Sequence, residues 1–214
     1  DLLLDAVEFQ APLETPVGLR FVEGSGVQSG LLYFVAHEAD DANDTDELYA
    51  LDRDSPNVVF AVTSDSATGS HISNVTPNPY SSSVAFARTG GSDPLAADQH
   101  PFVVDLDNFL FERDLTPTAV LNGSPFGRVM DGSLHFVPAD PANGVGDALV
   151  LSFGLLAEAD TGIAQLAAPL YYSLANLSDT LLEPQAVLLP IMNTQGLGGL
   201  YGVTITSARL STDR

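Results

Sequence analysis

The chain has 214 residues, with 28 acidic side chains against seven basic ones, and its formal net charge is -21. A hydrophobic fraction of 45% indicates a folded protein rather than a disordered acidic tail. The charge excludes nucleic acid as a partner and disfavours an anionic membrane surface, because no basic cluster exists to displace counterions. Cysteine is absent, which excludes disulfides, zinc–thiolate sites and thiol catalysis. No apolar run reaches the roughly 18 residues of a membrane-spanning helix, so membrane insertion is not expected.

Short runs rich in Val, Leu, Phe and Tyr follow one another along the chain, separated by clusters of Gly, Pro, Asn, Asp and Ser. This pattern predicts strands and turns rather than amphipathic helices. A leading strand and a linker are expected over residues 1–16. The further predicted strands are 17–22, 31–36, 48–52, 83–87, 102–105, 134–137, 148–151, 186–191 and 200–205.

The predicted strands recur at a nearly constant interval. Phe34, Phe86 and Phe136 lie 52 and then 50 positions apart in similar runs. In the next strand of each run, Tyr49 and Phe102 lie 53 positions apart. A period of 40 to 50 residues with about four short strands is typical of a β-propeller, whose sheets have two apolar faces and are stable only when stacked.

We therefore predict an all-β fold, a β-propeller of four-stranded antiparallel blades, with an ordinary β-sandwich as the alternative. About four repeat units of about 50 residues are expected, either as a small closed ring or as a fragment of a larger one. Because the chain begins at Asp1 without a signal segment, we expect a processed product or a piece of a longer protein. The propeller repeats cover 17–214, with approximate units at 17–66, 67–118, 119–168 and 169–214.

A family resemblance rests on the stretch from Leu115-Thr116 through Asp131-Gly132 to Phe136. It resembles the blade motif of TolB-type (PD40, WD40-like) propellers, in which Leu-Thr ends one blade and a Ser-Pro-Asp-Gly turn leads to the Phe of the next. The preceding copy departs from the motif, with Pro79-Tyr80-Ser81 in place of Pro-Asp-Gly. The resemblance covers roughly residues 17–155. It implies the propeller fold and leaves the activity open, since such domains serve as docking platforms, protease-gating domains and enzyme scaffolds.

Acidic residues are densest in the loop between the predicted strands 31–36 and 48–52. Side-chain oxygens alternate there like the first ligands of a calcium loop, although the glycine that an EF-hand needs for its sharp turn is missing. The alternative is a solvated acidic loop that protects a sheet edge from aggregation. The candidate calcium ligands are Asp40, Asp41, Asn43, Asp44 and Asp46.

Four Asn-x-Ser/Thr tripeptides are candidate sites of Asn-linked glycosylation if the host is a eukaryote or an archaeon. In a bacterium they would reflect only the preference of Asn, Ser and Thr for turns. The acceptor residues are Asn43, Asn74, Asn122 and Asn176.

No motif predicts a catalytic residue. The four histidines, at positions 37, 71, 100 and 135, lack the spacing of metal ligands and are expected to be structural or surface residues. We therefore predict an extracellular, cell-surface or periplasmic binding or structural module whose propeller loops dock a protein or glycan partner. Two alternatives stay open. One is a propeller hydrolase or lyase with acidic channel residues, and the other is a subunit of a surface assembly or filament, completed by another chain.

Overall fold

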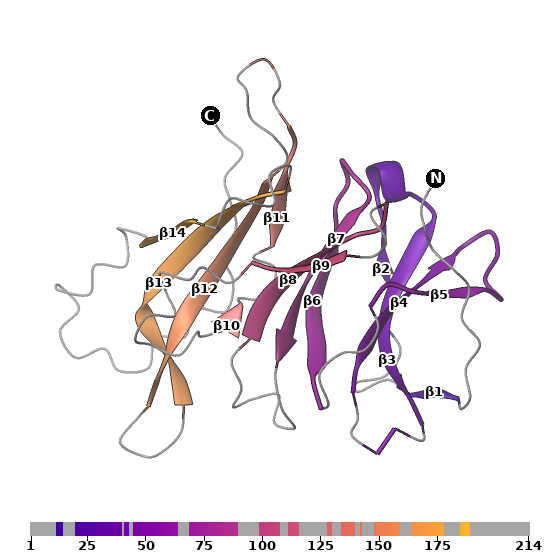
Figure 1. Ribbon diagram of the computed structural model, residues 1–214, viewed down its shortest axis with the longest axis horizontal. Helices are drawn as coiled ribbons and strands as arrows, with labels where there is room; N and C mark the ends of the chain where they lie inside the picture. The colour runs from indigo at the N-terminus through magenta and orange to yellow at the C-terminus, as the bar shows by residue number, and fades with distance from the viewer. Residues whose placement is uncertain are drawn as a thin grey trace. The chain divides into compact units, whose positions relative to one another are not determined.

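The computed structural model consists of strands and turns, as expected for an all-β protein (Figure 1). It divides the chain into two compact units, unit 1 (1–97 and 101–114) and unit 2 (98–100 and 115–214). None of its described residues form a helix long and apolar enough to cross a membrane. The described residues are 12–14, 20–39, 41–42, 45–63, 69–89, 99–107, 111–115, 128–129, 134–139, 142, 148–158, 164–177 and 185–188.

The first sheet, sheet 1, is antiparallel and has the strand order β1-β3-β4-β5, with β2 also paired to β3. Leu13 pairs with Glu38 near the end of β3, whereas Val22 pairs with Tyr33 near its start. The two short segments thus share the position of one edge strand. The strands of sheet 1 are β1 (Leu13–Glu14), β2 (Val22–Glu23), β3 (Leu31–Glu38), β4 (Glu47–Asp52) and β5 (Val59–Ala61), and a 3₁₀ turn, η1 (Gly26–Gln28), lies between β2 and β3.

Sheet 2 repeats this plan with an unbroken edge strand, in the order β6-β7-β8-β9. The pairing of β6 with β7 is interrupted by a bulge between Ser73 and Thr76. Asn74, inside the bulge, has a positive φ of 55°, which Asn tolerates better than most residues. The strands are β6 (His71–Pro77), β7 (Ser83–Thr89), β8 (Gln99–Asp105) and β9 (Phe111–Asp114).

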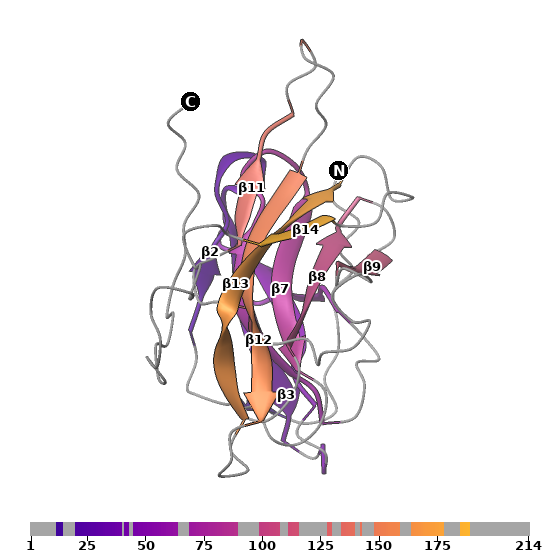
Figure 2. The ribbon, with the colours of Figure 1, turned by 90° about the vertical axis from the view of Figure 1, so that its left-hand side faces the viewer.

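Sheet 3, in unit 2, has the order β10-β12-β13-β14, with β11 also paired to β12. Its edge position is again shared by two short segments, because β10 pairs with the middle of β12 and β11 with its start. The long pair β12–β13 twists along its length (Figure 2) and has a register shift at Gly154/Leu155. The strands are β10 (Arg128–Val129), β11 (His135–Val137), β12 (Ala148–Glu158), β13 (Ala164–Asn176) and β14 (Gln185–Leu188).

The repeat predicted from the sequence agrees with the first two sheets and differs in the third. Phe34 and Phe86 lie on equivalent second strands, β3 and β7. Phe136 lies instead on β11, at the edge position, so it is not their equivalent. The boundary expected between residues 168 and 169 falls within β13. The expected leading strand, from Leu2 to Phe9, and the expected strand at 200–205 lie outside the described residues.

The core of unit 1 lies between sheets 1 and 2. One buried cluster includes Tyr33 and Leu48 from sheet 1 together with Phe86 and Val104 from sheet 2. Successive side chains of a strand point to opposite faces, and Phe34, the neighbour of Tyr33, is buried in a second cluster on the other face of sheet 1. Both faces of β3 are therefore covered, which explains its nearly continuous apolar sequence.

Candidate functional site

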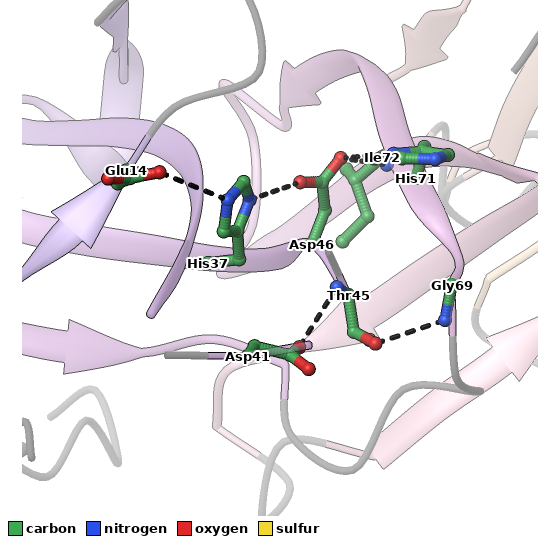
Figure 3. Close-up of polar contacts among 8 residues, drawn as sticks. All are labelled: Glu14, His37, Asp41, Thr45, Asp46, Gly69, His71 and Ile72. Carbon is green, nitrogen blue, oxygen red and sulfur yellow. Dashed lines mark hydrogen bonds and ion pairs between the residues drawn. The ribbon is translucent and has the colours of Figure 1, made fainter. Parts of the chain in front are cut away.

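The carboxylate of Asp46 is the centre of a buried polar cluster in unit 1 (Figure 3). Its side chain is only 1% exposed. Nδ1 of His71 lies 3.1 Å from its Oδ2, and Nδ1 of His37 lies 3.4 Å from its Oδ1. The backbone N–H of Ile72 also donates to Oδ2, at 3.3 Å. Both carboxylate oxygens therefore have nitrogen donors, as a buried charge requires.

Strand ends bring these residues together. Ala36 and Glu47 form the last pair of the β3–β4 register. His37 and Asp46 are the next residues beyond this pair, so they lie at the same end of the two strands. His71 opens β6 and brings sheet 2 to the same point. The cluster thus connects the two sheets.

Backbone contacts strengthen the connection. The N–H of Asp46 donates to the carbonyl of Ser70 at 2.9 Å. The N–H of Gly69 donates to Oγ1 of Thr45 at 3.0 Å. We call the set of Asp46, His37 and His71 the Asp46 tie.

The two imidazoles of the Asp46 tie have different surroundings. Nε2 of His37 lies 3.9 Å from the carboxylate of Glu14 on β1, so both ring nitrogens of His37 face acids. His71 keeps 21% of its side chain exposed. A buried carboxylate at Nδ1 fixes the tautomer and orientation of an imidazole, as it does in hydrolases and in metal sites. Among the described residues, no hydroxyl is hydrogen-bonded to the ring of His71.

Two of the five candidate calcium ligands, Asp41 and Asp46, lie in the described part. Oδ2 of Asp41 accepts the backbone N–H of Thr45 at 2.9 Å, whereas Asp46 faces the two histidines. Asp40, Asn43 and Asp44 lie outside the described residues. Within the described ranges, no group of three or more His, Asp or Glu side chains could hold a metal ion. Calcium binding stays a prediction from the sequence.

Of the candidate glycosylation sites, Asn74 is the one whose surroundings are described. It lies in the bulge of β6 and is half-buried. Asn176 ends β13, and Asn43 and Asn122 lie outside the described residues. Glycosylation also stays a prediction.

A second buried tie connects the opposite ends of the same two sheets, and no sequence pattern predicts it. Gln28, at the end of η1, is 1% exposed. Its Nε2 lies within hydrogen-bond distance of the carbonyls of Asn78 (3.0 Å), Ser81 (2.7 Å) and Ser83 (2.7 Å). Its Oε1 accepts the hydroxyl of Tyr33 at 2.5 Å. We call this set the Gln28 tie.

Both ties depend on polar residues beside predicted strands. Asp46 was expected to be a calcium ligand, and the histidines were expected to be structural or surface residues. The histidines were set aside because they lack metal-ligand spacing. The available signal was position, since His37 directly follows the predicted strand 31–36 and Asp46 lies shortly before the predicted strand 48–52. No comparable signal distinguishes Gln28, whose carbonyl partners lie 50 to 55 positions away.

Burial also changes two tyrosine hydroxyls in sheet 1. It raises the pKa of Tyr33 far above the ordinary range of a phenol. Burial, with a smaller contribution from the charges of Glu47 and Glu38, raises the pKa of Tyr49 to about 12. Both hydroxyls therefore stay neutral at physiological pH.

The Gln28 tie lies at what we call the turn end of unit 1, formed by the turns at 24–30, 52–58, 78–82 and 105–107. The N–H of Val27 donates to the carbonyl of Pro79 at 3.2 Å, which joins η1 to the β6–β7 turn. Figure 1 shows η1 beside this turn. The turns of two different sheets thus form one continuous surface.

Comparisons with protein-family models, with curated proteins and with solved structures find no match for this chain. The resemblance to TolB-type propellers therefore rests on the sequence motifs alone.

Proposed function

We propose that the chain is a binding module, with sheets stacked as in a TolB-type propeller or part of one, that docks a protein or glycan partner through its inter-strand turns. The observation that carries this proposal is the turn end of unit 1, where the Gln28 tie holds turns from two sheets in one arrangement. A surface that is ordered before binding loses little conformational entropy when it binds.

The stacking of the sheets supports the propeller part of the proposal. Sheet 1 has a buried apolar cluster on each face, with Tyr33 on one side and Phe34 on the other. A sheet in the middle of a stack needs two such faces, whereas a sheet of a simple two-layer sandwich needs one. The strongly acidic composition suits a module that works outside the cytoplasm.

Binding selections on the full chain test the proposed function. The folded chain is immobilised and exposed to a displayed library of random peptides and to an array of defined glycans. We expect reproducible binders from one of the two sets, and we expect the urea-unfolded chain to lose them. Failure of both sets to bind the folded chain would contradict a docking function.

A second candidate function, acid–base catalysis, is favoured by one observation, the orientation of His71 by the buried Asp46. Hydrolysis of chromogenic ester, phosphate and glycoside substrates by the wild-type chain, and its loss in His71→Asn, would support this alternative.

A further inference from the structure

Two large apolar side chains are exposed in adjoining turns at the turn end of unit 1. Val27 is 64% exposed and Tyr80 is 49% exposed, and their turns are joined by the hydrogen bond from Val27 to Pro79. Among the described residues, Phe21 is the other large apolar side chain that stays exposed, and it contacts Phe34 on the outer face of sheet 1 instead. Exposed apolar residues are common when scattered, but adjacent ones on a rigid support indicate an interaction surface.

The backbone beneath these two side chains is tightly fixed. Gly26, next to Val27, has a positive φ of 58°, and a Cβ at this position would lie 1.8 Å from the carbonyl oxygen of Pro79. The amide of Gln28 holds the carbonyls on both sides of Tyr80, those of Asn78 and Ser81. The apolar side chains are thus presented by a preorganised backbone, which is typical of residues that dominate binding energy.

The charges at this end of the unit have one predominant sign. The backbone N–H of Arg53 donates to Gly30, and that of Leu106 donates to Ser82, which places the turns 52–58 and 105–107 at the same end. Arg53 is itself paired with an acid of the same end, Glu23, at 3.2 Å. Among the described residues at this end, one is basic, Arg53, and five are acidic: Glu23, Asp52, Asp54, Asp105 and Asp107.

We propose that Val27 and Tyr80, which we call the Val27–Tyr80 surface, bind a protein segment that carries an aliphatic or aromatic side chain flanked by Lys or Arg residues. The apolar side chain of the partner packs against Val27 and Tyr80, and its cations face the surrounding carboxylates. The same charges disfavour an anionic glycan or an anionic membrane. This inference rests on the proposed docking function and names its partner class.

The test uses short synthetic peptides with one Leu or Trp between Lys and Arg residues. Two control sets replace the basic residues by Glu, or the Leu and Trp by Ser. Binding is measured by fluorescence anisotropy to the wild-type chain, to the double variant Val27→Ser/Tyr80→Ser and to the matched control Phe21→Ser. A further double variant, Glu23→Gln/Asp54→Asn, reduces the charge and leaves the apolar pair intact.

We expect the basic peptides to bind the wild-type chain and Phe21→Ser, and to bind Val27→Ser/Tyr80→Ser roughly tenfold more weakly or worse. Glu23→Gln/Asp54→Asn should bind more weakly at low salt and approach wild type as salt is added. Circular dichroism melts establish whether each variant is folded. If Val27→Ser/Tyr80→Ser is unfolded, the comparison of Glu23→Gln/Asp54→Asn with the wild-type chain still tests the proposal.

Equal binding of the basic peptides to all variants would overturn the Val27–Tyr80 surface and leave the docking function standing. Selection of only acidic peptides or glycans by the wild-type chain would also overturn the proposed partner class. Failure of every peptide and glycan to bind would contradict the docking function itself.

Discussion

Gly26 lies directly against the carbonyl oxygen of Pro79, 53 positions further along the chain, in the place where any other residue would have its Cβ. The contact joins a turn of sheet 1 to a turn of sheet 2. The two sheets can pack in this way only because Gly26 has no Cβ.

We expect Gly26→Ala to lower the free energy of unfolding by at least about 2 kcal/mol more than Gly30→Ala. Both glycines have positive φ, 58° and 101°, so both substitutions strain the backbone, but a Cβ at Gly30 meets no atom within 4 Å. Urea unfolding followed by circular dichroism measures the difference. Equal losses in the two variants would show that the contact with Pro79 is unimportant.

Removal of the Gln28 amide should destabilise unit 1. Gln28→Ala removes the acceptor of the Tyr33 hydroxyl and the donor to three carbonyls, and we expect a loss of about 2–3 kcal/mol. Ser29→Ala, at the neighbouring exposed position, should change the free energy of unfolding by less than about 0.5 kcal/mol. A Gln28→Ala chain as stable as Ser29→Ala would mean that the tie is energetically neutral.

Substitution of Asp46 tests the other tie. Asp46→Ala removes the acceptor of His37, His71 and the Ile72 N–H, and we expect a loss of about 3 kcal/mol. The exposed Asp54→Ala is the control, with little change expected. A double-mutant cycle of Asp46→Ala with His71→Ala should give a coupling energy of about 1 kcal/mol or more, and strictly additive losses would contradict a direct interaction.

Arg88 and Arg53 offer a comparison of a buried and an exposed ion pair. Arg88 is 11% exposed, makes two hydrogen bonds to Glu112 (2.6 and 3.2 Å) and lies over the rings of Phe86 and Phe102. We expect Arg88→Lys to cost about 1–2 kcal/mol, because lysine cannot reproduce the planar two-point contact or the stacking. Arg53→Lys, in a pair that is more than half exposed, should cost almost nothing in the same urea titration.

The two buried tyrosines predict a loss of stability at alkaline pH. The folded-state pKa of Tyr49 is about 12, above the ordinary value of about 10, so between these values the folded chain binds more protons than the unfolded chain. The free energy of unfolding therefore has its full contribution from Tyr49 below about pH 10 and falls as the pH rises toward about 12. Tyr33 acts in the same direction.

Urea titrations across this alkaline range measure the effect. Tyr49→Phe keeps the ring that stacks on Phe34 and removes the ionisable hydroxyl, so the stability of this variant should depend less steeply on pH. An unchanged slope would contradict the assignment of the effect to Tyr49.

The sequence predicted the parts of the fold that depend on local pattern. The runs around Phe34 and Phe86 lie on β3 and β7, and those around Tyr49 and Phe102 on β4 and β8, because alternation and turn residues determine strands locally. The order of strands in sheet 3 was not predicted. Strand β12 is longer than the predicted run 148–151, no strand was predicted at β13, and pairing across a sheet is not a local property.

The candidate site was less accessible to sequence reasoning than the fold. Asp46 was identified as a candidate calcium ligand, but its histidine partners were not predicted. His71 lies 25 positions away on another sheet. Gln28 was not identified at all, because a single glutamine has no distinguishing pattern. Contacts between elements are decided by tertiary packing, which one sequence does not reveal.

The shared core of unit 1 has a consequence for how the chain opens. Tyr33 and Phe86 belong to one buried cluster although they come from different sheets, so separation of the sheets exposes apolar surface on both. The backbone amides at the centres of β3 and β7 should therefore exchange their hydrogens through the same opening event. The short, half-buried β5 lies outside that cluster and can fray alone. The smallest cooperative unfolding unit of this core is then the pair of sheets 1 and 2, because neither sheet buries the shared cluster without the other.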